Sequence, residues 1–181
     1  MFGVNARVPA VEDAIDGIVG QWRRERPDLG EEELAAMALF GRLGRLAQVA
    51  EPLVGRTFAR HGFGTGEFDV LAALRRSGEP YTLTPTTLAR TLMLSPAAMT
   101  NRLDKLEAAG RVERRLDPDN RRSMLVSLTA AGREAVDTVV AEHVANERDL
   151  LSVLPAADRT RLDTLLRRLL AGWTETVGGD H

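Results

Sequence analysis

A run of small and polar residues that begins at a serine in the middle of the chain is suited to contact another molecule. Ser95 and Pro96 pair a hydroxyl that can cap a helix with the residue favoured at the first helical position. The first turns of that helix would present Ser95, Pro96, Ala97, Thr100 and Asn101. Small side chains let the backbone approach a partner closely, and an asparagine amide can form paired hydrogen bonds to a base edge. These residues therefore predict a helix that enters the major groove of double-stranded DNA.

Basic side chains are concentrated directly after this start. Residues 101–122 carry seven of them against five acidic ones, although the net charge of the whole chain is −2. The seven are Arg102, Lys105, Arg111, Arg114, Arg115, Arg121 and Arg122. We expect Arg115, Arg121 and Arg122 to contact DNA, and the last two, at a turn, to grip phosphate or enter a narrow minor groove. A basic stripe on an acidic body suits a protein that contacts DNA with one face.

Two short helices must position this surface. Thr84-Pro85 repeats the hydroxyl–proline start and predicts a helix over 84–92, while the Ser95 helix should run over 95–109 and end at Gly110. Only a turn of two or three residues separates them, which predicts a helix-turn-helix. The inner face of the second helix would be held in the core by Met99, Leu103 and Leu106.

Alternating residues after Gly110 predict a β-hairpin. Residues 111–116 and 121–128 alternate as strands do, and the DPDN sequence at 117–120 between them favours a turn. A further short strand is expected at 81–83. A hairpin that directly follows a helix-turn-helix is a wing, so the fold class is mainly α with a small β-wing.

The rest of the chain is expected to be helical and to associate with a second copy. Apolar periodicity predicts helices over 10–26, 31–61 and 66–76, the third capped by Thr65, then one after Thr129 and one after Pro155. Helices at both ends carry apolar stripes, which a small winged domain cannot bury against itself, so we expect a homodimer on pseudo-palindromic DNA. The last helix has six such residues: Leu162, Leu165, Leu166, Leu169, Leu170 and Trp173.

Several functions are not expected from the composition. The chain has no cysteine, and its three histidines, at positions 61, 143 and 181, lack the spacing of metal ligands. There is no nucleophile–base signature, phosphate-binding loop or dinucleotide motif, so we expect no enzyme, cofactor or metal site. The first residues lack the apolar run of a signal peptide, and no stretch approaches the roughly 20 apolar residues that span a bilayer. We therefore expect a cytoplasmic protein.

The run LTPTTLARTLMLSPAAMTNRLDKLEAAGRVERRLDPDNRRSMLVSLTAAG resembles the MarR family along its full length, and the flanking helices fit as well. The resemblance implies a winged helix-turn-helix plus interlocking N- and C-terminal dimerisation helices, and a repressor of transcription. It divides the chain into N-terminal helices (1–62), a DNA-binding domain (63–128) and C-terminal dimerisation helices (129–181). One departure from the family is Asn120, which stands where a second Asp is frequent, while Asp119 and Arg121 are retained.

The N-terminal segment IVGQWRRERPDL resembles the urate-responsive subgroup of this family, which has an extra N-terminal helix. In that subgroup a Trp, an Asp and two Arg mark the ligand site, and the matching positions are Trp22, Asp69, Arg102 and Arg114. A flat anion could stack on the indole and pair with the guanidinium groups. The resemblance thus implies a small aromatic or anionic effector, such as urate, that releases the protein from DNA.

A second interpretation remains open. Asp69 and Arg102 could form a permanent structural ion pair that positions the recognition helix, with Trp22 as ordinary core and Arg114 bound to phosphate. The protein would then be a DNA-binding regulator or an architectural protein without a small-molecule ligand. Ligand-dependent thermal stabilisation would separate the two interpretations.

Overall fold

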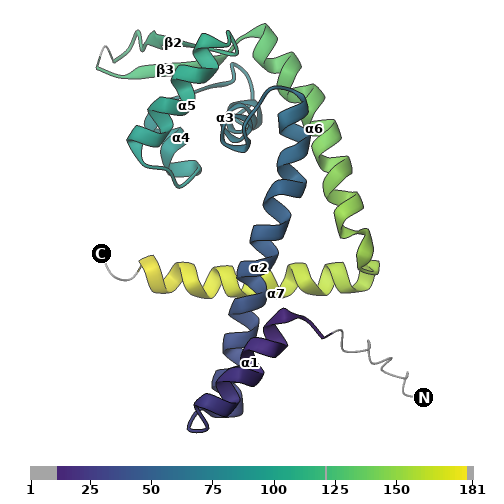
Figure 1. Cartoon of the computed structure of the whole chain (residues 1–181). Helices are drawn as coiled ribbons and strands as arrows, with labels where there is room; N and C mark the ends of the chain where they lie inside the picture. The colour runs from purple at the N-terminus through teal and green to yellow at the C-terminus, as the bar shows by residue number, and fades with distance from the viewer. Residues whose placement is uncertain (1–11, 121, 179–181) are drawn as a thin grey trace, which may run out of the picture. The chain divides into compact units, whose positions relative to one another are not determined.

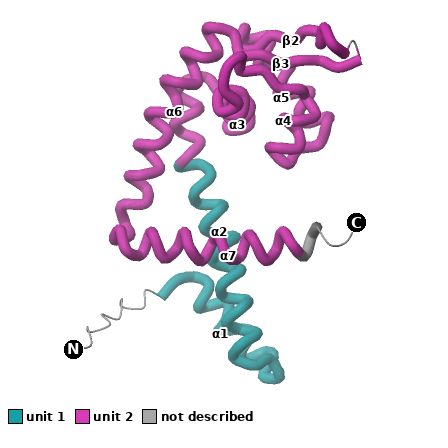
Figure 2. The backbone as a smooth tube through the Cα atoms, turned by 180° about the vertical axis from the view of Figure 1, so that it is seen from behind, with its two compact units in different colours: residues 1–53 teal, residues 54–181 magenta. Residues whose placement is uncertain are grey.

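The computed structural model describes residues 12–120 and 122–178, and the chain divides into two compact units, residues 1–53 and 54–181 (Figure 2). The long helix α2 (Glu31–Arg60) contributes to both units. The division of the chain into three parts by function, at residues 62 and 128, stays a prediction.

The first unit pairs α1 (Ala14–Glu25) with most of α2. The carboxylate of Asp13 caps α1 by accepting the backbone N–H groups of Ile15 (2.8 Å) and Asp16 (3.3 Å). Arg42 on α2 donates to the carboxylates of Asp13 and Asp16, so the cap also joins the two helices. Ile15 is buried against Gly41, where a Cβ would lie 3.2 Å from its side chain.

The predicted start of α1 at Ala10 is corrected by this cap. Glu12 and Asp13 are not helical, because Asp13 adopts the extended backbone of a cap residue. Ala10 and Val11 lie outside the described residues. The predicted stop at Pro27 is confirmed, since α1 ends at Glu25 and a turn follows.

The second unit contains α3 (Thr65–Arg76) and a helix-turn-helix made of α4 (Pro85–Thr91) and α5 (Pro96–Ala108). The hydroxyl oxygens of Thr84 and Ser95 accept the backbone N–H groups of Thr87 (3.1 Å) and Ala98 (3.2 Å), which confirms both predicted caps. The expectation that Thr65 caps α3 is wrong: Thr65 is already helical, and Glu67 accepts the N–H of Gly64 instead.

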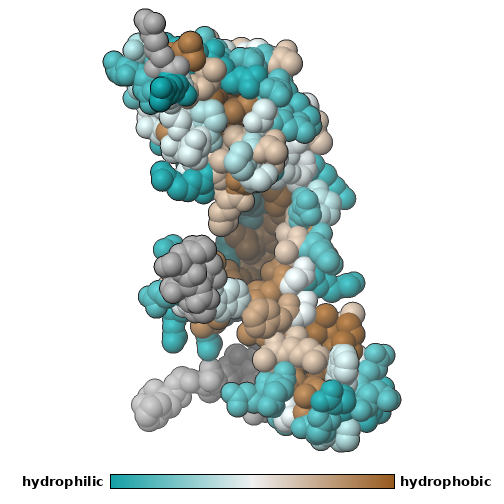
Figure 3. Space-filling view, turned by 90° about the vertical axis from the view of Figure 1, so that its left-hand side faces the viewer, coloured by the Kyte–Doolittle hydropathy of each residue, from teal (hydrophilic) through white to brown (hydrophobic). Residues whose placement is uncertain are grey.

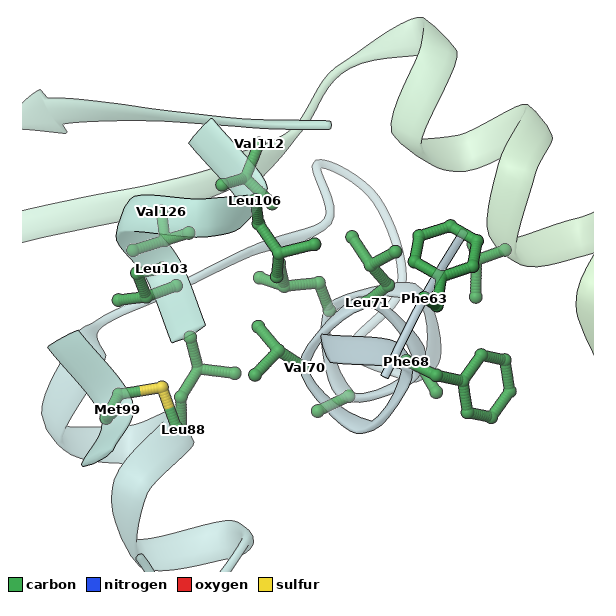
Figure 4. Close-up of a cluster of buried hydrophobic side chains, with 14 of the residues drawn as sticks. Phe63, Phe68, Val70, Leu71, Leu88, Met99, Leu103, Leu106, Val112 and Val126 are labelled. Carbon is green, nitrogen blue, oxygen red and sulfur yellow. The ribbon is translucent and has the colours of Figure 1, made fainter. Parts of the chain in front are cut away.

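One apolar core joins these three helices. Figure 4 shows side chains of α3, α4 and α5 meeting in it, with the sulfur of Met99 beside Leu88. Val70, Leu71 and Leu88 are fully buried, and the inner face of α5 is buried as the sequence predicts. This packing fixes the rotation of α5 and so decides which of its residues face outward.

A three-stranded antiparallel sheet completes the winged part. Its strands are β1 (Thr82–Leu83), β2 (Val112–Leu116) and β3 (Met124–Leu128), in the order β1-β3-β2. Arg114 pairs with Val126, and the N–H of Asp117 donates to the carbonyl of Ser123 (3.0 Å) where the hairpin turns. The predicted wing is confirmed, and Figure 1 shows it beside α5.

The second unit ends with α6 (Ala130–Leu150), a short 3-10 helix η1 (Leu151–Val153) and α7 (Ala156–Gly178). The Thr129 hydroxyl caps α6 by accepting the N–H of Gly132 (3.0 Å). A Cβ on Gly132 would collide with the carbonyl of Arg111, so this position requires glycine. The predicted fold class, mainly α with a small β-wing, is confirmed. Within the described residues, no helix has the length and apolarity needed to cross a membrane.

Candidate nucleic-acid interface

The leading turns of α5 are open to solvent on one side. Ser95, Pro96, Ala97, Thr100 and Asn101 are all exposed. The Thr100 hydroxyl donates to the carbonyl of Pro96 (3.0 Å), and the Asn101 side chain has no hydrogen bond to another described residue. The helix therefore presents small groups and one uncommitted amide, a surface that can approach base edges in a major groove.

The hairpin adds positive charge to the same part of the second unit. Arg115 on β2 and Arg122 at the turn are exposed, and neither forms an ion pair with another residue in the described ranges. Arg121 lies outside the described residues. Neither guanidinium group has to break an internal ion pair before it binds a phosphate, so no free energy is lost in that step.

Asn120 takes part in the turn of the wing. Its side-chain oxygen accepts the N–H of Arg122 (3.3 Å), and its carbonyl accepts the N–H of Ser123 (2.7 Å). The carboxylate of Asp117 accepts the N–H of Asp119 (3.0 Å). A carboxylate at position 120 would offer a similar acceptor oxygen, so the departure from the family pattern preserves this side-chain contact.

Arg114 joins the wing to α5. Its guanidinium group donates to Glu107 and lies 2.7 Å from a carboxylate oxygen of Asp104. The hydrogen bond to Glu107, and next the one to Asp104, raise the pKa of Arg114, while Arg114 lowers the pKa of the Glu107 carboxyl. Because Arg114 lies on β2 and both acids on α5, these contacts set the hairpin relative to the recognition helix.

Arg114 itself was predicted as a ligand residue, but its acidic partners were not singled out from the sequence. The signal available was the run LEAAGRVER, in which Glu107 precedes Arg114 by one tight turn. Arg90 was also missed. It is exposed in the last turn of α4 and has no ion pair within the described part of the chain, so it can add a phosphate contact beside α5.

Asp69 and Arg102 lie near each other without an ion pair within 4.0 Å in the described residues. Burial raises the pKa of the Asp69 carboxyl, against smaller opposing effects from Arg102, Arg76 and His143. Arg102 donates instead to the carbonyl of Gly66 (3.4 Å), and a Cβ on Gly66 would collide with its guanidinium group. The guanidinium of Arg102 therefore connects α5 to α3 through backbone.

The four predicted ligand residues are divided between the two units. Trp22 lies on α1 in the first unit, and its side chain is partly exposed. Asp69, Arg102 and Arg114 belong to the second unit, where Arg114 is held by the acids of α5 and Arg102 donates to the carbonyl of Gly66. The structure thus brings Asp69 and Arg102 into electrostatic range and gives Arg114 other partners.

Comparison with known proteins relates this chain to a known family. A family model for the MarR family matches residues 61–123, which contain α3, the helix-turn-helix and the first strand of the wing, β2. The HTH-type transcriptional regulator PecS of Dickeya dadantii (strain 3937) is 39% identical over 155 residues, which cover 86% of this chain and 92% of PecS.

Solved structures agree with this relationship. Wild-type apo MarR from E. coli matches 72% of this chain and 96% of its own, with 27% identity and a TM-score of 0.61. BpsR of Bordetella bronchiseptica, solved to explain regulation of its DNA binding by 6-hydroxynicotinic acid, matches 71% of this chain and 90% of its own, with 25% identity and a TM-score of 0.64. The homologues are regulators and not enzymes, and the chain belongs to the MarR family of DNA-binding transcriptional regulators.

Proposed function

We propose that this chain is a homodimeric repressor that binds a pseudo-palindromic operator and leaves it when a small aromatic or anionic ligand binds. The observation that supports the DNA contact best is the exposed leading face of α5 beside the arginines of the wing. Ser95, Thr100 and Asn101 would contact base edges, while Arg115 and Arg122, with Arg121 from the sequence, would hold the backbone.

Exposed apolar side chains support the homodimer. In the first unit, Leu39, Leu46 and Val49 of α2 are each more than half exposed, and a hollow of about 380 Å³ lies between them and Ile15. Figure 3 shows apolar surface of this kind among hydrophilic regions. A second copy would cover such surface, and two-fold symmetry would place two α5 helices about 34 Å apart, one turn of DNA.

Support for a ligand comes from Arg102 and from a relative. The BpsR structure concerns the regulation of DNA binding by 6-hydroxynicotinic acid, a planar anion at neutral pH. Arg102 sits on α5 and has no carboxylate within 4.0 Å among the described residues, so an anion can still pair with it. We propose Trp22, Asp69, Arg102 and Arg114 as the site, as in the urate-responsive subgroup, with urate as the first ligand to test.

The test is a titration with labelled DNA from upstream of the gene that encodes this protein. Fluorescence anisotropy should show tight binding to that duplex and weak binding to a shuffled one, and urate should release the specific complex. Equal affinity for both duplexes would contradict the regulator. No release at millimolar urate, with the protein still folded, would discard urate alone.

A regulator without a ligand is the second candidate. The packing of the Arg102 guanidinium over Gly66 favours it, because this contact already gives Arg102 a structural role between α5 and α3. A ligand that binds only the native state raises the melting temperature. If urate and 6-hydroxynicotinate both leave the melting temperature unchanged, the second candidate is preferred.

A further inference from the structure

A cavity of about 440 Å³ lies in the second unit where the end of α5, the start of β2 and the first turns of α6 meet. Its walls include Phe63, Ala109 and Arg111, together with Glu134 and Ala135 of α6. None of these residues belongs to the outward face of α5 or to the four residues of the proposed effector site. Its volume falls within the range of small-molecule sites.

Arg111 is held in this wall with its charge uncompensated. Its guanidinium group lies over the ring of Phe63, 4.2 Å from the centroid, and the residue is half-buried. Its backbone is fixed by hydrogen bonds to Leu106 (2.9 Å) and from Thr129 (3.2 Å). The guanidinium itself has no ion pair or hydrogen bond with another described residue. A planar guanidinium placed in this way can bind a carboxylate through two parallel hydrogen bonds.

Glu134 supplies the opposite charge on the same cavity. It forms no ion pair within 4.0 Å with any residue of the described ranges, Arg111 included. The other carboxylates nearby are already paired, since Glu142 contacts His61 (3.1 Å) and Glu67 contacts Lys105 (3.5 Å). One cation and one anion, neither in an ion pair with a residue of the described ranges, therefore line a single cavity.

The remaining walls combine small apolar side chains with two polar ones, His61 and Thr138. Ala109, Ala131, Ala135 and Val139 leave room for an aliphatic group between the two charges. A simple carboxylate would pair with Arg111 but leave the charge of Glu134 unpaired. A simple amine would pair with Glu134 but leave the charge of Arg111 unpaired. A molecule that carries a carboxylate, an ammonium group and a short apolar side chain fits all three features.

We propose that this cavity binds a free aliphatic α-amino acid, with its carboxylate on Arg111 and its ammonium group on Glu134. Such a ligand would lie against Ala109, the C-terminal cap of α5, and against the first turns of α6. The inference is independent of the effector site proposed above, because it concerns other residues and is tested without DNA.

The test is isothermal titration calorimetry of the full chain with L-leucine, N-acetyl-L-leucine and L-leucinamide. We expect saturable binding of L-leucine and affinities lower by about tenfold or more for both blocked derivatives, each of which has lost one charge. Absence of saturable heat up to about 10 mM L-leucine with folded protein would overturn the proposal. Equal binding of either blocked derivative would also overturn it.

Two variants and two matched controls complete the experiment. Glu134→Gln removes a charge from an exposed side chain, and Arg111→Gln removes the guanidinium group. Asp149→Asn and Arg148→Gln make the same changes at an exposed pair near the far end of α6. We expect both cavity variants to lose about tenfold or more in affinity for L-leucine and both controls to keep it. If Arg111→Gln unfolds, Glu134→Gln decides, and unchanged affinity in that variant would contradict the proposed contact.

Discussion

Most apolar side chains of the winged part (α3, α4, α5 and the three strands) are buried, whereas most of those of helix α7 are exposed. Leu71 and Leu103 of the winged part are at most 1% exposed, whereas Leu165 and Leu170 of α7 are 47% and 63% exposed. Both sets recur at helical spacing, so the sequence pattern is the same in the two regions. The difference lies in whether the chain supplies a covering surface. The core of the winged part is completed within the second unit by Phe58 of α2 and Val139 of α6, while α7 leaves an apolar face for the second copy proposed above.

The largest effect is expected from a cavity in the winged core. Leu103→Ala should lower the free energy of unfolding by about 2–5 kcal/mol, because it removes a buried side chain and leaves an unfilled space. Leu170→Ala, an exposed leucine on α7, is the matched control. Urea denaturation should be measured at a protein concentration where the chain is monomeric. There, Leu170→Ala should change the free energy of unfolding by only about 0.5 kcal/mol. Equal losses in the two variants would remove the contrast between the regions.

Charges on α7 should break the association without unfolding the winged part. In Leu165→Glu combined with Leu170→Glu, two carboxylates replace apolar groups that we expect at the dimer interface. Sedimentation should show a monomer, and operator affinity should fall by about 100-fold, because each copy then binds a single half-site. Circular dichroism checks that the helices persist. A variant that remains a dimer would exclude this face of α7 from the interface.

Asn101→Ala tests the outward face of α5. We expect a loss of about 1–3 kcal/mol in binding to the operator, the size of one base contact, and little change on a shuffled duplex. Arg122→Gln should instead weaken both duplexes to a similar extent and lower the salt dependence by about one counterion. Arg148→Gln, an exposed arginine near the end of α6, should change neither affinity. If Asn101→Ala lost affinity for both duplexes to the same extent, Asn101 would contact the DNA backbone and not a base.

The smallest effect concerns pH and the contact between the wing and α5. Arg114 lowers the pKa of the Glu107 carboxyl in the folded protein, so this contact stabilises the fold fully at pH values above the pKa of the unfolded chain's glutamate. The stabilisation is lost as the pH falls through the lower folded pKa. Urea denaturation from about pH 6 to pH 3 should therefore bring wild type and Glu107→Gln closer in stability. A difference that does not change with pH would contradict the contact.

Local chemistry explains why much of the fold could be predicted from the sequence. Hydroxyl–proline pairs at Thr84 and Ser95 set the starts of α4 and α5, and the 117–120 turn set the hairpin, because each signal acts within a few residues. The same reasoning placed the cap of α3 one residue late. Glu67 reaches back to the Gly64 N–H, and a helix can use this acceptor in place of a hydroxyl.

Contacts between distant residues explain the rest of the candidate site. The run LEAAGRVER brings Glu107 close to Arg114 in sequence but does not show that Arg114 contacts Asp104 as well, because the turn after α5 first has to bring the strand back along the helix. One of the two interpretations paired Arg102 with the Asp69 carboxylate, yet Arg102 donates a hydrogen bond to the Gly66 carbonyl. Residue types indicate which groups carry charge, whereas packing decides which partner each charge obtains.

Methylation protection of operator guanines tests the central claim most directly, because guanine N7 lies in the major groove. The account predicts protection in two stretches about 10 base pairs apart when the protein saturates the DNA. A bound protein that leaves guanine N7 reactive in both half-sites would contradict it.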